Sequence, residues 1–294
     1  MADELRLESR PDLDSPVLVT AFRGWNDGGQ GASLAAQHLV NTWDAEKFAD
    51  IDPEGFFDFQ ATRPRVSLVD GLTRKIDWPE NDFFYASPEG GRDVVLLVGT
   101  EPNIRWRTFT ELVVDLVREL GVDLVVSLGA LLADVPHTRP APVTGAASDP
   151  ELVERLGLQA SRYEGPTGIV GVLHDACRQH GIPSVSFWAA VPHYVSLAPS
   201  PRAALSLCGR LSSLLETPID VSELEEMVEG YTSHVSEAVS SDEDAAAYVD
   251  ELEQRADLIE ESDLPSGDSI AAELTRFLRE REQGDTPPDV AREQ

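Results

Sequence analysis

The chain has 294 residues, of which 41% are hydrophobic, so it is long enough to bury a large core. Its 53 acidic and 23 basic residues give a formal net charge of −30. A surface this negative repels nucleic acid and anionic membranes, which argues against both as partners. No apolar run reaches the roughly 18 residues of a membrane-spanning helix, and the first residues carry no basic leader pattern. We therefore expect a soluble, cytoplasmic protein.

Four short apolar runs predict the strands of a sheet, at residues 17–22, 94–98, 124–128 and 184–189. Each run is continuously apolar rather than alternating, as is typical of central strands that are buried on both faces. Helical patterns separate them at residues 32–43, 105–120, 167–180 and 200–216, and a shorter helix is expected to start with Asp149 as its cap and Pro150 as its first residue. This alternation predicts an α/β fold with a mostly parallel central sheet and helices on both faces.

Residues 56–76 depart from the alternation. Asp70 and Gly71 separate two strand-like runs, which is a hairpin pattern, and we expect an antiparallel hairpin that projects from the main sheet. Aromatic residues are enriched at the centres of interfaces, so this region is predicted to join copies of the chain. The alternative is that its aromatic residues cover the end of the sheet within one chain. They are Phe56, Phe57, Phe59, Trp78, Phe83, Phe84 and Tyr85.

Composition changes near residue 216. From there to the end the chain holds 24 acidic and five basic residues, a net charge of −19. Apolar residues at helical spacing continue to residue 278 and predict about three acidic helices, each with one apolar face. We therefore divide the chain into an α/β domain at 1–215, an acidic helical extension at 216–283 and a tail at 284–294 that we expect to be disordered.

The stretch RGWNDGGQGAS, residues 23–33, places four glycines directly behind the first predicted strand. It lacks the Gly-Lys-Ser/Thr ending of a Walker loop and the G-x-G-x-x-G spacing of a dinucleotide fingerprint. A nucleotide site is therefore not expected here. We interpret the stretch as a corner in which Asn26 or Asp27 caps the next helix and the glycines allow close packing.

Polar and aromatic residues follow the predicted strands where each strand ends. Ligands of open α/β sheets bind beyond the carboxyl ends of the strands, so these residues define a candidate cleft. An anion could be held by His137 with Arg139, or by backbone N–H groups at Thr167. The alternative for His137 is that it fixes a loop through hydrogen bonds. The candidates are Trp25, Asn26, Asp27, Glu101, Asn103, Arg105, His137, Arg139, Thr167, His193 and Tyr194.

No pattern identifies a reaction, and catalytic residues stay unassigned. The G-x-S-x-G elbow of serine hydrolases is absent, and Ser127 falls within or at the end of a strand. Cys177 and Cys208 lie in helical patterns and are expected to be buried thiols. His174 and His180 are six residues apart on one helix, so they do not share a face as metal ligands would. We predict no metal site and no cofactor.

Four segments together resemble the PAC2 family of proteasome assembly chaperone 2-like proteins. They are AFRGWNDGGQGAS, GALLADVPHTRPAPVTGAASD, YEGPTGIVGVLHDACRQHGIPSVSFWAAVPHYV and PSPRAAL, and the resemblance covers about residues 15–215. It implies an α/β sandwich similar to nucleoside phosphorylases and peptidyl-tRNA hydrolases, with an acidic helical C-terminal extension like that of the bacterial branch. Eukaryotic members help to assemble proteasome α-rings, and archaeal relatives form homo-oligomers.

Two functions stay open at this point. The first is an oligomeric binding or assembly protein with proteasome subunits as partners. A trimer is the first guess because phosphorylase-like folds often assemble in that way. The alternative is a hydrolase or phosphorylase that acts on a small molecule in the strand-end cleft, where Arg105 and Arg139 would stabilise an anion. The absence of a recognisable catalytic set favours the first function, and whether the chain is an enzyme stays undecided.

Overall fold

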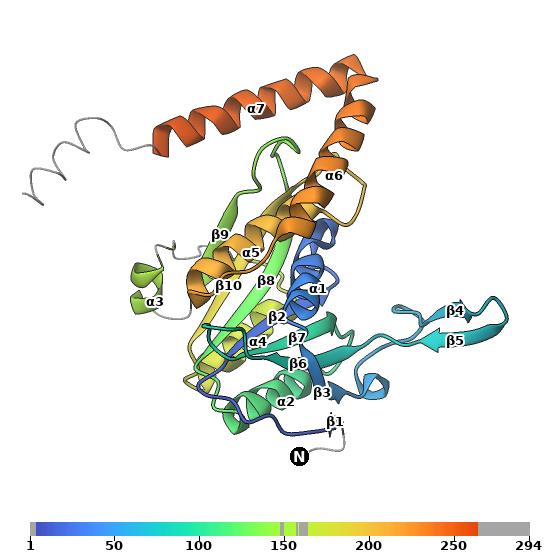
Figure 1. Cartoon of the computed structure of the whole chain (residues 1–294), viewed down its shortest axis with the longest axis vertical. Helices are drawn as coiled ribbons and strands as arrows, with labels where there is room; N and C mark the ends of the chain where they lie inside the picture. The colour runs from blue at the N-terminus through green and yellow to red at the C-terminus, as the bar shows by residue number, and fades with distance from the viewer. Residues whose placement is uncertain (1–3, 148–149, 157, 159–163, 264–294) are drawn as a thin grey trace, which may run out of the picture.

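The computed structural model describes residues 4–147, 150–156, 158 and 164–263. Its centre is an eight-stranded sheet, and a separate two-stranded hairpin projects from it (Figure 1). The strands are β1 (Leu5–Leu7), β2 (Val17–Arg23), β3 (Glu46–Ile51), β4 (Arg65–Val69), β5 (Thr73–Asp77), β6 (Asn81–Ala86), β7 (Val94–Thr100), β8 (Leu124–Ala133), β9 (Val143–Ala147) and β10 (Ser184–Pro192). The helices are α1 (Gly31–Thr42), α2 (Trp106–Glu119), α3 (Pro150–Arg155), α4 (Ile169–Gln179), α5 (Pro201–Leu215), α6 (Ser222–Ser240) and α7 (Glu243–Asp263).

The strand order of the large sheet is β1-β3-β6-β7-β2-β8-β10-β9. The four strands predicted from continuous apolar runs are β7, β2, β8 and β10, and they lie side by side in parallel. Antiparallel strands flank them on both sides: β6, β3 and β1 beyond β7, and β9 beyond β10. The predicted α/β fold with a parallel centre is confirmed, and the sheet as a whole is mixed because its edges are antiparallel.

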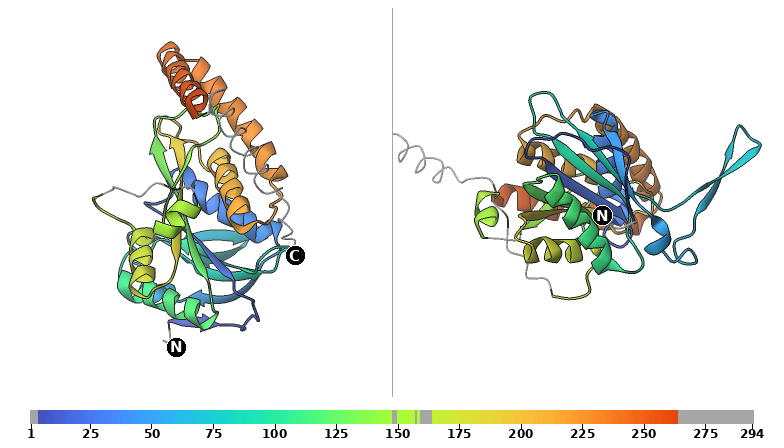
Figure 2. Two further views of the ribbon diagram at one scale, coloured as in Figure 1. Left: turned by 90° about the vertical axis from the view of Figure 1, so that its left-hand side faces the viewer. Right: turned by 90° about the horizontal axis from the view of Figure 1, so that it is seen from below.

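Helices cover both faces of the sheet, as predicted (Figure 2). On one face α1 and α5 pack against side chains such as Val19 and Val126. On the other face α2 and α4 pack against side chains such as Leu18 and Leu97. Cys177 lies in the second of these cores and Cys208 in the first, and both thiols are buried as expected. Burial raises the pKa of each thiol to about 12, so neither is a reactive thiolate at neutral pH.

The predicted hairpin is formed by β4 and β5, which pair through five residues on each strand and turn at Asp70 and Gly71. It extends away from the rest of the molecule (Figures 1 and 2). The expectation that the neighbouring aromatic residues lie at an interface is wrong for Phe56, Phe57 and Phe83, which are at most 5% exposed. They pack in the core beneath α2, because three large rings there fill the end of the sheet within one chain.

The large apolar side chains that the hairpin region exposes are mainly aliphatic. Leu72 at its tip is 88% exposed, and Trp78 at its base is 45% exposed and contacts Phe59 ring to ring. The cross-strand pairing puts Val66 opposite Ile76 and Leu68 opposite Arg74 on one face, while Ser67 and Lys75 face the other way. The full set of exposed apolar residues is Val66, Leu68, Val69, Leu72, Ile76 and Trp78.

Two of the predicted acidic helices are α6 and α7; the third, expected near residues 270–278, and the tail at 284–294 lie outside the described residues. Helix α6 packs against α5, and its Leu224 belongs to the core that contains α1. His38 of α1 also bonds the backbone oxygen of Asp220, just before α6, with 2.7 Å between its Nε2 and that oxygen. The start of the acidic region is therefore built into the α/β body. Among the described helices, none combines the length and apolar character needed to cross a membrane.

Candidate functional site

The glycine-rich corner after β2 forms the start of helix α1. Asp27 accepts hydrogen bonds from the backbone N–H of Ala32 at 2.8 Å and from the hydroxyl of Ser33 at 2.5 Å. It therefore caps the first turn of α1, as the sequence predicted for Asn26 or Asp27. Asp27 is 6% exposed, and this burial raises the pKa of its carboxyl.

Two glycines of this corner are required by close contacts. A side chain at Gly31 would lie 2.7 Å from Cβ of Ala203 on α5, so α1 and α5 can approach only if residue 31 is glycine. Gly29 has a φ of +58°, and a side chain there would lie 2.9 Å from Val191 of β10. The interpretation of this stretch as a tight corner is consistent with both contacts.

Glu101, after β7, collects three donors from other elements. Its carboxylate accepts the side-chain amide of Asn26 at 3.0 Å, the backbone N–H of Trp25 at 3.0 Å and the backbone N–H of Ile169 at 2.8 Å. Ile169 is the first residue of α4, so Glu101 supplies the negative group at this helix start. The anion that the sequence placed near Thr167 is therefore the chain's own carboxylate, and Thr167 itself is exposed.

Asn103 and Arg105 hold the loop before α2 to distant parts of the chain. Asn103 accepts the backbone N–H of Asp58 at 3.0 Å. Arg105 forms an ion pair with Glu4 at 2.5 Å, and its guanidinium lies 5.1 Å from the ring centre of Phe56. Its positive charge is thus neutralised by a carboxylate near the N-terminus.

His137 is buried at 1% exposure in the loop after β8. Its Nδ1 lies 2.8 Å from the hydroxyl of Tyr194, which also accepts the His137 backbone N–H, and its Nε2 lies 2.9 Å from the hydroxyl of Ser236 on α6. Burial lowers the pKa of the imidazole, the charge of Arg202 lowers it further, and Glu253 opposes the shift. His137 therefore joins two loops to α6 in its neutral form, which is the loop-fixing alternative.

His193 and Tyr194, after β10, continue this contact toward α7. The ring of Tyr248 on α7 lies 5.8 Å from His193 and 6.0 Å from Tyr194, each edge to face. His193 is exposed and lies 3.2 Å from a carboxylate oxygen of Asp134. These edge-to-face contacts between aromatic rings stabilise the packing of α7 over the strand ends.

Arg139 pairs with two carboxylates of α7. Its Nε donates to Asp257 at 2.7 Å, and its Nη1 lies 3.6 Å from Glu253, which also accepts the hydroxyl of Thr138. Arg139 lowers the pKa of Asp257 through this hydrogen bond. The guanidinium therefore binds carboxylates of α7 and is not presented to a substrate.

Six of the strand-end candidates fall into two groups with different neighbours, while Asp27 caps α1 and Asn103 and Arg105 contact Asp58 and Glu4. Asn26, Glu101 and Trp25 meet at the start of α4, and His137, Tyr194 and Arg139 meet at α6 and α7. Their polar groups are engaged with one another or with the helices that cover them. This arrangement fixes loops, and the two arginines expected to stabilise an anion are both paired with carboxylates.

The sequence did not single out the residues that complete these contacts. Ser236, Tyr248, Glu253 and Asp257 lie in the acidic helices, where hydroxyl and carboxylate side chains are so common that no spacing marks them. Only their positions opposite the loops give them a role.

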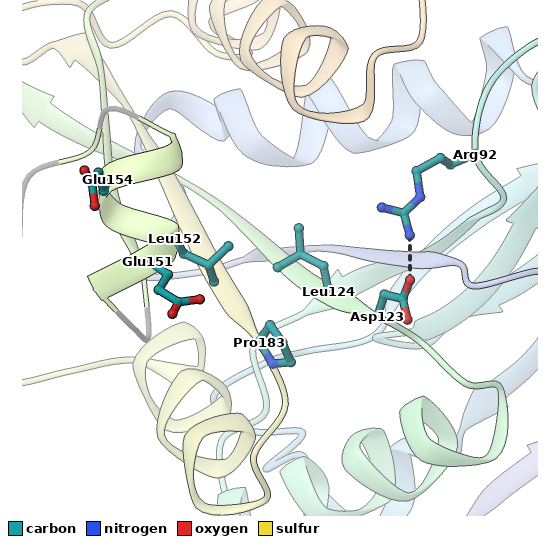
Figure 3. A pocket seen from close by; sticks show the side chains of 7 residues that line it. All are labelled: Arg92, Asp123, Leu124, Glu151, Leu152, Glu154 and Pro183. Carbon is teal, nitrogen blue, oxygen red and sulfur yellow. Dashed lines mark hydrogen bonds and ion pairs between the residues drawn. The ribbon is translucent and has the colours of Figure 1, made fainter. Parts of the chain in front are cut away.

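A hollow of about 610 Å³ lies at the opposite ends of the central strands, where β8 and β10 begin (Figure 3). Arg92 and Asp123 form an ion pair of 2.9 Å on one side of it, and Glu151 and Glu154 of α3 lie on the other. None of the predicted cleft residues lines this hollow. Over the described residues no three His, Cys, Asp or Glu side chains gather as a metal site would require.

The sequence and the fold both match known proteins. A model of the PAC2 family matches residues 21–239, which reach into α6. A PAC2 family protein from Streptomyces avermitilis is 48% identical, covering 80% of this chain and 99% of its own, with a TM-score of 0.74. A proteasome-assembly chaperone homologue from Mycobacterium tuberculosis is 46% identical, covering 79% of this chain and 99% of its own, with a TM-score of 0.73.

More distant structures share the fold alone. An archaeal proteasome activator from Pyrococcus furiosus is 19% identical, covering 80% of this chain and 97% of its own, with a TM-score of 0.65. No match was found among curated proteins.

Proposed function

Because the chain belongs to the PAC2 family, we propose that it is an oligomeric protein that assists the assembly of proteasome subunits in the cytoplasm. The observation that carries this proposal is the 46% identity with a proteasome-assembly chaperone homologue over nearly the full length of that protein. Identity at this level across the whole fold makes a shared type of partner the simplest expectation.

The surface of the molecule supports a function in binding proteins. The hairpin exposes an apolar face with Val66, Leu68 and Ile76, and an isolated two-stranded hairpin gains little stability in water on its own. Exposed apolar patches of this kind mark surfaces that become buried against another protein. Residues 62–77 also carry four basic and two acidic side chains, in a chain whose net charge is −30.

The charge of the hairpin favours a second copy of this chain as its partner. Its positive side chains complement the acidic surface that every copy carries on α6 and α7. A closed ring in which each hairpin contacts the next copy would bury the apolar face in every protomer, and a trimer stays our first guess.

We infer that proteasome subunits would dock on exposed apolar side chains where the central strands end. Trp25 follows β2 and is 63% exposed, Leu131 and Leu132 at the end of β8 are 48% and 61% exposed, and Leu197 after β10 is 41% exposed. Since β2, β8 and β10 are parallel neighbours, these side chains lie at one edge of the sheet. The alternative of a hydrolase or phosphorylase loses support because Arg105 and Arg139 are already paired.

The assembly proposal is tested with purified proteasome α and β subunits from the same organism. Native gels follow the formation of half and complete particles with and without the protein, and we expect it to accelerate the appearance of half particles. The paired substitutions Leu131→Asp and Leu132→Asp should abolish this effect. The matched control Ser67→Asp adds a charge on the polar face of the hairpin and should leave the effect unchanged.

Self-association is tested separately by light scattering. Leu68→Asp places a charge on the apolar face of the hairpin and should dissociate the oligomer, whereas Ser67→Asp should not. An unchanged rate of particle assembly in the presence of the protein would contradict the chaperone function. A monomeric wild type would contradict the oligomer alone.

A further inference from the structure

Helix α5 begins in the interior without a side-chain cap. Its N-cap residue, Ser200, is 1% exposed and makes no capping hydrogen bond, and its own backbone N–H donates to Gly29 at 2.7 Å. Pro201 at the first helical position has no N–H. The backbone N–H groups of Arg202 and Ala203 therefore lie at the positive end of the dipole of a 15-residue helix. The Ser200 hydroxyl does not cap them.

Tyr231 of α6 adds an unpartnered hydroxyl beside this helix start. Its side chain is 8% exposed, and its hydroxyl forms no hydrogen bond within the described part of the chain. Arg202 of α5 bonds Thr232, the next residue of α6, so the guanidinium lies beside Tyr231. Burial raises the pKa of Tyr231, while the neighbouring Ser200 side chain and the charge of Arg202 oppose the shift. A buried hydroxyl without a partner is costly, because it has lost its hydrogen bonds to water.

Arg202 is a half-buried cation without a carboxylate partner among the described residues. Its Nη2 donates to the hydroxyl of Thr232 at 2.7 Å, but its buried Nε has no partner in the same part of the chain. Burial lowers the pKa of the guanidinium, and the neighbouring Tyr231 opposes this shift. Arg105 and Arg139, by contrast, are both paired, although all three belong to a chain with 53 acidic residues.

These donors lie near the carboxyl ends of the parallel strands, where α/β proteins bind ligands. The backbone oxygen of Gly29, which accepts the Ser200 N–H, belongs to the corner after β2, and a side chain at Gly29 would lie 2.9 Å from Val191 near the end of β10. The helix start thus lies beyond the carboxyl ends of parallel strands and beneath α6.

We propose that the buried N-terminus of α5 binds an oxyanion, the carboxylate or phosphate group of a small ligand. Arg202, the Tyr231 hydroxyl and the first-turn N–H groups are all donors, and what they lack in common is a negatively charged acceptor. Such a group would satisfy the guanidinium Nε and the phenol together and would complement the helix dipole. The proposal goes beyond assembly of proteasome subunits, because it requires no protein partner.

The site is tested by calorimetric titration of the full chain with sodium phosphate and, separately, with sodium acetate, at constant ionic strength in a buffer without oxyanions. We expect saturable binding to the wild type by at least one of the two anions. Arg202→Gln and Tyr231→Phe should each weaken it by about tenfold, as expected for the loss of one hydrogen bond to a charged group. The control Arg210→Gln removes the same charge from an exposed position of the same helix and should bind like the wild type.

The two titrations distinguish the sources of the oxyanion. Binding of phosphate alone identifies a phosphate ligand, binding of acetate alone identifies a carboxylate, and both outcomes support the site. If neither anion binds, or if both variants bind as tightly as the wild type, the proposal is overturned and the donors are satisfied by water alone. Tyr231→Phe removes a single oxygen atom, so it carries the test if Arg202→Gln fails to fold.

Discussion

Arg139 binds Asp257 at two points: its Nε donates to Oδ1 at 2.7 Å and its Nη2 donates to Oδ2 at 3.0 Å. The loop after β8 is thereby joined to α7 across 118 positions of the chain. His137, two residues earlier in the same loop, is joined to α6. One loop therefore holds α6 and α7, the acidic helices that the structure describes, over the strand ends.

Arg139→Gln should loosen α7 without unfolding the protein. Both partners are partly exposed, so the change in the free energy of unfolding should stay below about 1 kcal/mol. Hydrogen exchange of the α7 amides should nevertheless rise, because the helix loses its two-point contact with the loop. Arg255→Gln breaks an ion pair within α7 itself and serves as the control. Equal exchange rates in the two variants would show that Arg139 does not hold the helix.

Asp27→Asn should reveal a dependence of stability on pH. Burial raises the pKa of Asp27 above its ordinary value of 3.8, so the folded protein holds this proton more tightly than the unfolded chain does. The stability of the wild type relative to the variant is therefore fully present below about pH 3.8 and is lost as the pH rises through the higher folded pKa. Urea unfolding of both proteins across this range measures the difference, and a constant difference would rule out the shift. Asp27→Ala removes the cap altogether and should cost about 1–2 kcal/mol.

Gly29→Ala and Gly209→Ala should change stability in opposite directions. At Gly29 the φ of +58° and the 2.9 Å approach to Val191 both oppose a side chain, so we expect a loss of about 1–3 kcal/mol. Gly209 lies on the exposed side of α5 with no atom within 4 Å of a new Cβ, so alanine should add about 0.5–1 kcal/mol there. Thermal melting of the two variants compares them directly, and equal melting temperatures would refute the corner interpretation.

His137→Asn should remove part of the sensitivity of the protein to acid. Burial lowers the pKa of His137 below its ordinary value of 6.5, so the unfolded chain takes up this proton first. The contribution of neutral His137 to the free energy of unfolding is present above pH 6.5 and is lost as the pH falls through the lower pKa of the folded state. Arg202 strengthens this direction, Glu253 opposes it, and Tyr194 and Ser236 contact the ring without charge.

Urea unfolding at pH 7.5 and at about pH 5 measures the acid sensitivity of wild type and His137→Asn. His174 also has a pKa lowered by burial, but it is present in both proteins and cancels in the comparison. The control His234→Asn changes an exposed residue of α6. If wild type and His137→Asn lose the same stability on acidification, the histidine does not titrate as proposed.

Self-association should strengthen as salt is added. Each chain carries a net charge of −30, and the repulsion between copies is screened within about 10 Å at 0.1 M salt. Salt also screens the attraction between the basic hairpin side chains and the acidic helices, but the repulsion between whole chains of charge −30 is the larger effect. Contacts through the apolar face of the hairpin are not weakened by salt, so the oligomer should gain relative to the monomer. Light scattering across a sodium chloride series measures the mass. A mass of 32.1 kDa at every salt concentration would contradict the oligomer.

The sequence was sufficient to predict the centre of the sheet but not its edges. β2, β7, β8 and β10 are buried on both faces, which makes their runs continuously apolar. Edge strands have no such pattern: Lys47 of β3 and Asp82 of β6 form an ion pair of 3.0 Å between adjacent strands. Charged residues of this kind read as loop until the partner strand is known.

The loops of the candidate site were predicted, but their partners were not. His137 and Arg139 were identified by position after a strand, whereas Ser236 and Asp257 lie about one hundred residues away in helices rich in similar side chains. Only the fold brings them together. Arg202 could have been noticed, since it is a lone cation among apolar residues at the start of a helix in PSPRAAL.

The central position of β2 in the sheet means that this strand stays unpaired for a long time during synthesis. β2 is the second strand synthesised, yet it pairs only with β7 and β8, which begin 71 residues or more after it ends. At a synthesis rate of about 5–20 residues per second, this apolar, aggregation-prone segment stays unpaired in the nascent chain for several seconds. A protein proposed to guide the assembly of other chains thus itself emerges in need of shielding, and its yield on overexpression should improve when translation is accompanied by nascent-chain chaperones.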